Sequence, residues 1–161
     1  MGGHEGVVKL LLERKDINPN TGDFKCGHTP LRLGAISGHA EVVKLLLQRE
    51  DINPNLAETE HGLTPLMCAA LRADERIVKL LLERDDINLD IVDTIYGRTA
   101  LSLAAIDGHE GVVKLLLERK DINPNVADTE HGRTALGWAA LRGYNGVVNS
   151  DGHDHGWYTR S

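Results

Sequence analysis

The most constraining feature of the sequence is a segment of eighteen residues that occurs twice without a change, at 3–20 and at 108–125. A looser copy runs from 38 to 55, and a more divergent one from 73 to 90. Equivalent valines stand at a constant step of 35 residues: Val8, Val43, Val78, Val113 and Val148. A fixed step of this length indicates stacked repeating units rather than a single globular core.

The composition suits thin layers of aliphatic side chains. Aromatic residues make up only 4% of the chain, so the core must be built from Leu, Val, Ile and Ala. The net charge is -6 and the basic residues are dispersed, which argues against a nucleic-acid partner because phosphate binding needs a basic face. The apolar runs are too short to span a bilayer, so no membrane partner is expected. Cys26 and Cys68 stand at different repeat positions and are interpreted as reduced thiols, which favours the cytoplasm, with the nucleus as the alternative.

One helix of each repeat is apolar over most of its circumference. In the copy that starts at Gly38, the apolar residues within 42–47 leave only Glu41, Lys44 and Gln48 on a narrow polar strip. Such a helix must be covered on two sides. We expect this long helix to stop at Asp-Ile-Asn-Pro, at 51–54 in this copy, because proline removes a hydrogen-bond donor and pushes the preceding residue into an extended conformation.

A shorter helix precedes each long one, and a threonine marks its start. These threonines are Thr29, Thr64, Thr99 and Thr134, and a proline follows the first two. A capping hydroxyl before a proline at the first helical position is a strong start signal. Small residues follow, which let this helix approach its neighbours closely, and Gly38, Gly108 and Gly143 supply the turn into the long helix.

Polar segments connect one helix pair to the next. Residues 56–63 and 126–133 are closely similar, are too polar for a third helix and carry a glycine near their end. We expect them to form hairpin-like fingers. Each unit therefore consists of a helix, a tight turn, a second helix and a finger.

Four short motifs recur in this register. They are Gly-x-Thr-Pro-Leu at 62–66, paired alanines at 104–105, Gly-His at 38–39 and Val-Val-x-Leu-Leu-Leu at 112–117. With them the chain resembles the ankyrin-repeat proteins, and the Asp-Ile-Asn-Pro-Asn segments and the 35-residue period are similar to fungal ankyrin arrays. The resemblance implies an all-α solenoid of helix-turn-helix units joined by hairpin-like fingers.

The resemblance divides the chain into an ankyrin-repeat domain at 1–149 and a C-terminal tail at 150–161. Within the domain we expect a partial repeat at 1–23, repeats at 24–58, 59–93 and 94–128, and a partial repeat at 129–149. The first unit is a long helix with no short helix before it, so apolar surface is expected to be partly open there. This end is therefore expected to associate or to fray, and the options for a partner are a second copy of the chain and a larger parent protein.

Two histidine positions matter for the scaffold. The histidine that usually follows Thr-Pro-Leu in the family is replaced here by Arg32, Met67, Ser102 and Gly137. The hydrogen bond from that imidazole to the finger backbone should then be missing, and looser fingers are expected. His4, His39 and His109 share a second position, where the resemblance implies that the side chain caps the turn between the helices.

Ankyrin-repeat proteins bind partners on a concave face, through the fingers and the ends of the short helices. Carried over to this sequence, the partner-binding residues are Ile36, Glu60, His61, Leu71, Arg72, Ile95, Tyr96, Arg98, Ile106, Asp107, Glu130, His131, Arg133, Leu141 and Arg142. Four of them, Ile36, Leu71, Ile106 and Leu141, form an aliphatic stripe flanked by charged residues. This stripe is either a docking surface or an apolar row that the fingers fold over and bury.

The resulting functional hypothesis is a protein-protein interaction module with an unidentified protein partner, no enzymatic activity, no cofactor and no metal. The alternative is a small-molecule or catalytic site in the concave groove, around His61, Arg72, Tyr96, Asp107, His131 and Arg142. No phosphate-binding loop or nucleophile motif is present, and Cys68 occupies a leucine position where it should be buried and inert. His61 and His131 lie two repeats apart, too far to share a metal ion.

The tail contains one further candidate site. His153, Asp154 and His155 could bind a divalent ion weakly, but the surrounding glycines give no preorganisation. A solvated polar tail is the favoured interpretation.

Overall fold

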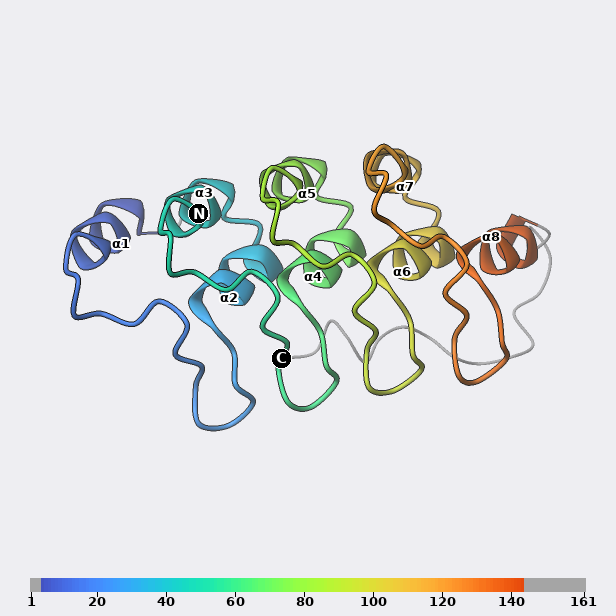
Figure 1. Ribbon diagram of the computed structural model, residues 1–161, viewed down its shortest axis with the longest axis horizontal. Coiled ribbons are helices and arrows are strands. Elements are labelled where there is room, and N and C mark those ends of the chain that lie inside the picture. Colours follow the sequence, from blue (N-terminus) through green and yellow to red (C-terminus); the bar gives the residue numbers. More distant parts are fainter. Residues whose placement is uncertain (1–3, 144–161) are drawn as a thin grey trace.

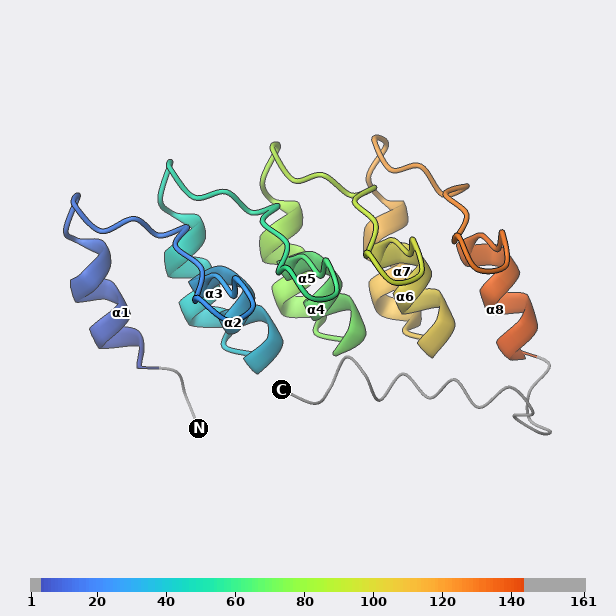
Figure 2. The same cartoon turned by 90° about the horizontal axis from the view of Figure 1, so that it is seen from below.

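The computed structural model describes residues 4–143, and in that range the chain forms eight α-helices and no strand. The outer helices are α1 (Glu5–Leu12), α3 (Ala40–Leu47), α5 (Glu75–Leu82) and α7 (Glu110–Leu117). The inner helices are α2 (Pro30–Ser37), α4 (Pro65–Leu71), α6 (Ala100–Asp107) and α8 (Ala135–Gly143). Figures 1 and 2 show the two sets as parallel rows, with the fingers projecting to one side. The predicted all-α repeat solenoid is confirmed.

Local signals set the start of the inner helices. The side-chain oxygens of Thr29, Thr64 and Thr99 each accept a hydrogen bond from the backbone N–H three residues further on, as predicted. Gly38 and Gly108 end α2 and α6 in the left-handed conformation, with φ of 75° and 72°. The equivalent position after α4 is Ala73, which adopts φ of 55° despite its side chain.

The outer helices end earlier than the sequence predicts. Helix α3 stops at Leu47, before the proline segment, so that the outer and inner helices are of similar length rather than long and short. Just beyond this helix end lies Arg49, whose guanidinium forms two hydrogen bonds with the Asp51 carboxylate, at 2.8 and 2.7 Å. It also donates to the carbonyl oxygen of Leu12, the last residue of α1, at 3.1 Å.

Arginines at the same repeat position make equivalent hydrogen bonds to the ends of α3 and α5. Arg84 pairs with Asp86 and donates to the carbonyl oxygen of Leu47, and Arg119 donates to that of Leu82 at 2.8 Å. Each arginine therefore caps the outer helix of the preceding repeat, where a positive charge also favours the helix dipole. In return, the hydrogen bonds from these guanidiniums hold the pKa values of their aspartate partners below the ordinary value.

The asparagines of the Asp-Ile-Asn-Pro-Asn segment form a second link between repeats. The side-chain amide of Asn20 donates to the carbonyl oxygen of Asp51, and its oxygen accepts from the N–H of Asn53, both at 2.7 Å. Asn55 makes the same pair of bonds to the next repeat. The residues that recur most regularly in the sequence thus form hydrogen bonds between repeats.

Packing is confined to nearest neighbours. Outer helices pack on outer helices one repeat away, inner helices pack on inner helices one repeat away, and α2 with α3, α4 with α5 and α6 with α7 pack within each repeat. Val43, Ile77 and Leu81 are fully buried between the two rows. Small residues such as Ala35 and Ala69 bring the inner helices close together, as the sequence predicts.

One expectation about the turns is wrong. His4, His39 and His109 stand at the N-cap positions of the outer helices, but their side chains make no capping hydrogen bond. Only Asp74, at the equivalent position before α5, caps its helix, by accepting from the N–H of Ile77 at 3.1 Å. A carboxylate oxygen is a much better acceptor for the first-turn N–H groups than an imidazole nitrogen. Among the described residues, no helix is long and apolar enough to cross a membrane.

Candidate functional site

A carboxylate at the start of each finger organises its backbone. The clearest case is Glu58, which is buried and accepts hydrogen bonds from the N–H groups of Glu60, His61 and Leu63 at 2.7, 2.8 and 3.2 Å. Burial raises the pKa of this carboxyl group, but the bonds from Leu63, Glu60 and His61 together outweigh it and leave the pKa below its ordinary value. The equivalent residues in the other fingers are Asp23, Asp93 and Asp128.

Neighbouring fingers are joined through their backbones. The N–H of Thr94 donates to the carbonyl oxygen of His61, and that of Thr129 donates to Tyr96, both at 2.8 Å. Gly62 lies beside this junction at φ of 73°, and a Cβ there would stand 2.7 Å from Cγ2 of Thr94. The fingers are therefore anchored by a carboxylate and by each other, although other residues replace the family's imidazole in every repeat. The expectation of looser fingers is based on the missing imidazole alone and does not include these anchoring hydrogen bonds.

The predicted partner-binding residues divide into three groups by exposure. Exposed residues are Glu60, Arg72, Ile95, Asp107, Glu130, His131 and Leu141. Half-buried residues are Ile36, His61, Leu71, Tyr96, Arg133 and Arg142. Arg98 and Ile106 are buried, whereas the sequence analysis placed both on the partner-binding surface. The burial of Ile106 interrupts the proposed aliphatic stripe. Ile106 lines a groove together with Ala139 and Arg142 of α8.

Four residues from the third and fourth fingers and α8 form an arginine-aromatic cluster: Tyr96, Arg98, Arg133 and Trp138. The Arg98 guanidinium lies 4.1 Å from the centre of the Tyr96 ring and 4.8 Å from that of Trp138. Arg133 stacks on Trp138 at 4.8 Å as well. Contacts at these distances are attractive cation-π interactions, which strengthen when the cation is shielded from water.

Acidic side chains hold this cluster in place. The indole N–H of Trp138 donates to the Asp128 carboxylate at 2.6 Å, and a guanidinium nitrogen of Arg98 lies 3.4 Å from Glu130. Nε of Arg98 is buried and has no hydrogen-bond partner within the described part of the chain. The two aromatic rings therefore supply much of the environment that stabilises this buried charge.

Trp138 is the member of this cluster that the sequence analysis missed. It occupies a core position of the repeat, equivalent to Leu33, Cys68 and Leu103, so its pattern predicts only packing. A possible signal was its residue type, since it is the aromatic residue at a position that is otherwise small or aliphatic. Tyr96, Arg98 and Arg133 were predicted, and the structure brings these three together.

Catalytic chemistry finds little support among the described residues. Cys68 is buried as predicted, and burial is the largest influence that raises the pKa of its thiol to about 11, which keeps it protonated. Glu58, Glu60 and His61 place three potential metal ligands within 4.8 Å of one another. The Glu58 oxygens, however, already accept three backbone hydrogen bonds. His153, Asp154 and His155 lie outside the described residues.

The residues named for the alternative small-molecule site do not all line the groove that the structure shows. A groove of about 900 Å³ lies between α6, α7 and α8, and of the six residues named for that site only Asp107 and Arg142 line it. His61, Tyr96 and His131 are finger residues and Arg72 follows α4, so they do not converge on this groove. Tyr96 instead belongs to the arginine-aromatic cluster, and the His131 ring lies edge-on to Trp138 with 5.6 Å between the ring centres.

Comparison with known families agrees with this architecture. A model described as ankyrin repeats (3 copies) matches residues 1–93 and 85–150, which together cover nearly the whole chain. The chain belongs to the ankyrin-repeat family. Ankyrin repeats are generally protein-protein interaction modules and are typically not enzymes. A search of curated proteins finds no match to this ankyrin-repeat chain.

Proposed function

We propose that this ankyrin-repeat protein binds a protein partner through the concave face formed by its fingers and inner helices. Tyr96 and Arg133, the half-buried members of the arginine-aromatic cluster, lie at the centre of this interface, and the buried Arg98 and Trp138 support them from beneath. Tyrosine, tryptophan and arginine are the residue types most enriched at binding hot spots. The observation that carries the proposal is the stacking of two arginines on two rings beside fingers whose sequences differ from repeat to repeat.

The electrostatics of the cluster favour an acidic side chain on the partner. Arg133 stacks on Trp138 and forms no ion pair within the described residues, so the edge of its guanidinium is available to a carboxylate. A planar guanidinium binds a carboxylate through two parallel hydrogen bonds, and the ring beneath fixes its orientation. Ile95 is exposed nearby on the third finger and adds an apolar contact.

The test is affinity capture from extracts of the source cell, with partners compared between the wild type and Ile95→Glu/Arg133→Glu. Both positions are accessible, so circular dichroism should show unchanged helicity while capture of the partner falls at least about tenfold. Lys44→Glu, an exposed change on α3, is the matched control and should capture normally. A partner retained by the double variant, or lost equally from the control, would overturn the proposed interface.

A further inference from the structure

At the two ends of the described range, α1 and α2 on one side and α7 and α8 on the other expose positions whose equivalents are buried in the internal repeats. Helices α1 and α7 have the same sequence, so their equivalent residues can be compared directly. Val7 of α1 is 55% exposed, whereas its equivalent Val112 is 1% exposed against the preceding repeat. Leu11 is exposed and its equivalent Leu116 is buried. The open face of α1 is thus equivalent to the face that α7 buries where it packs on α5 and α6.

The inner row repeats this pattern. Leu33 of α2 is 45% exposed, while the equivalent Leu103 of α6 is 1% exposed. At the other end, Leu136 of α8 is 78% exposed, while its equivalent in α6, Leu101, is 2% exposed. In the interior, each inner helix packs on the next, and these positions are buried there. We infer that α2 and α8 carry opposite halves of one such interface.

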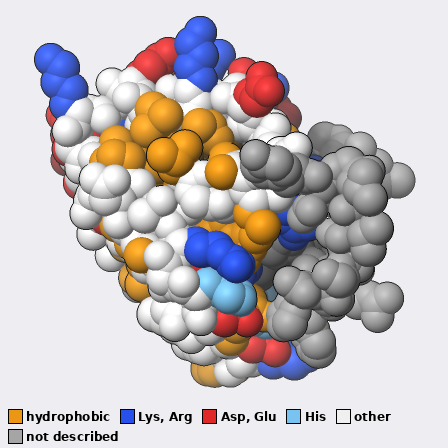
Figure 3. All heavy atoms as spheres, turned by 90° about the vertical axis from the view of Figure 1, so that its right-hand side faces the viewer, with side chains coloured by type: hydrophobic (Ala, Val, Ile, Leu, Met, Phe, Trp, Pro, Cys, Tyr) orange, Lys and Arg blue, Asp and Glu red, His pale blue; other side chains and the backbone are white. Residues whose placement is uncertain are grey.

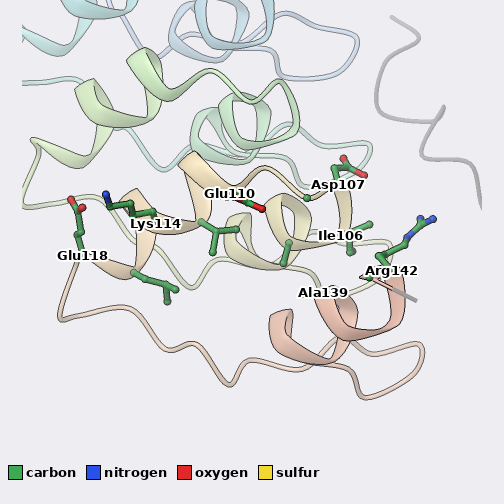
Figure 4. A pocket seen from close by; sticks show the side chains of 12 residues that line it. Ile106, Asp107, Glu110, Lys114, Glu118, Ala139 and Arg142 are labelled. Carbon is green, nitrogen blue, oxygen red and sulfur yellow. The ribbon is translucent and has the colours of Figure 1, made fainter. Parts of the chain in front are cut away.

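The end of the array that carries α7 and α8 is hollowed and apolar. Figure 3 shows hydrophobic side chains gathered on this end, with charged side chains around them. The groove of about 900 Å³ described above lies here, and Val113 and Leu117 of α7 and Ala139 of α8 line it. Figure 4 shows Lys114 and Glu118 at one side of the groove and Arg142 at the other. By the 35-residue register, this is the place of the next outer helix.

The hydrogen-bonding groups at the two ends are also complementary. Arg14 forms the same pair of bonds with Asp16 that Arg119 forms with Asp121. Arg119 also caps the preceding outer helix, whereas Arg14 has no such carbonyl partner among the described residues. Among the four outer helices of the described range, α7 is the one whose end, at Leu117, receives no hydrogen bond from an arginine of a following repeat.

The fingers extend this complementarity to a third layer. The carbonyl oxygens of Cys26, His61 and Tyr96 each accept from the N–H of a threonine in the following finger. His131 is the next residue in that series, and Phe24 stands in the first finger at the threonine position. A Cβ placed at Gly132 would meet no described atom within 4 Å, whereas a Cβ at Gly62 or Gly97 would meet a threonine of the following finger. Phe24 is fully exposed.

We propose that these surfaces bind each other in a second copy of the chain. Helices α1 and α2 of one copy stack on α7 and α8 of another, so that α1 completes a repeat with α8. Arg14 then caps α7, Leu33 covers Leu136, and the N–H of Phe24 meets the carbonyl oxygen of His131. The junction continues the interface that already joins every internal pair of repeats.

The sequence favours a second copy over the chain's own following residues in this groove. Residues 145–152 occupy the register of an outer helix, but after Val147 and Val148 they read Asn-Ser-Asp-Gly where α1 has Lys-Leu-Leu-Leu. Helix α1 therefore supplies the apolar residues that the internal interfaces use. Because the junction joins unlike surfaces, each added copy presents a fresh end, and assembly proceeds head to tail beyond a dimer.

The experiment is sedimentation velocity on the full chain over about a hundredfold range of concentration. The wild type should shift from monomer to larger species as concentration rises. Val7→Glu blocks the first surface and Leu117→Glu blocks the second, and each variant alone should stay monomeric with unchanged circular dichroism. Mixed together they still hold one intact surface of each kind, so they should form a one-to-one heterodimer that grows no further.

Val92→Glu is the matched control, because Val92 is an exposed apolar residue in the third finger, away from both ends. This variant should assemble like the wild type. A wild type that stays monomeric at all concentrations would overturn the proposal and indicate that the groove is filled within the chain or left open to water. Assembly that survives in either single variant, or a mixture that remains monomeric, would overturn it too.

Discussion

Replacing Glu58 with glutamine tests whether buried carboxylates hold the fingers in shape. One carboxylate oxygen accepts from Glu60 and the other from both His61 and Leu63. Glutamine keeps a single acceptor oxygen, so at least one buried N–H loses its partner and the remaining bonds lose their charge. A net contribution of about 1.5–3 kcal/mol per charged bond, against about 0.5–1.5 for a neutral one, gives a loss of about 3 kcal/mol in the free energy of unfolding.

Urea unfolding followed by circular dichroism measures this loss. Glu58→Asp is the matched control, because aspartate fills the same position in the other three fingers, and it should cost less than about 1 kcal/mol. The pKa of Glu58 is lowered from 4.5 in the folded protein, so its stabilising effect is complete above that pH and disappears as pH falls through the lowered value. The gap between wild type and Glu58→Gln should narrow over the same range. A gap below about 1 kcal/mol at neutral pH would refute the assignment.

Two further predictions concern the fingers and the thiols. Gly62→Ala should destabilise the protein by about 3 kcal/mol, since the added Cβ meets Thr94, whereas Gly132→Ala should cost about 1 kcal/mol for its positive φ alone. Equal unfolding midpoints for the two variants would contradict the packing argument. In mildly alkaline buffer, iodoacetamide should modify the half-exposed Cys26, while the buried Cys68, with its pKa of about 11, should react only as the chain unfolds. Peptide mass spectrometry that found equal rates would show that Cys68 is accessible.

The order of helices could be predicted from the sequence because its signals are local. Thr29, Thr64 and Thr99 cap the helices that they precede, and the 35-residue step places every outer helix. The helix ends were predicted less well. Arg49, two residues after the end of α3, donates to the carbonyl oxygen of Leu12, which is distant in sequence, and a pattern read along one repeat does not contain that contact.

The candidate site could be predicted only in part for the same reason. Family resemblance placed Tyr96, Arg98 and Arg133 on the binding face, and the structure brings them together. The burial of Ile106 depends on its neighbours in α8, and the role of Trp138 depends on the two arginines that stack on it. Contacts between different elements decide both, and residue type at one position does not reveal them.

The arginine that caps each outer helix gives the array a direction. A repeat supplies the cap for the unit before it and depends on the unit after it for its own. The segment that carries Arg119 therefore contains both the arginine that caps the preceding outer helix and, at the end of α7, a helix terminus that the next arginine can cap. A duplicated unit can therefore form the same arginine-capped contact with both of its neighbours without any compensating change elsewhere. The two identical copies at 3–20 and 108–125 are consistent with such duplication. Arrays of this kind can lengthen by copying alone.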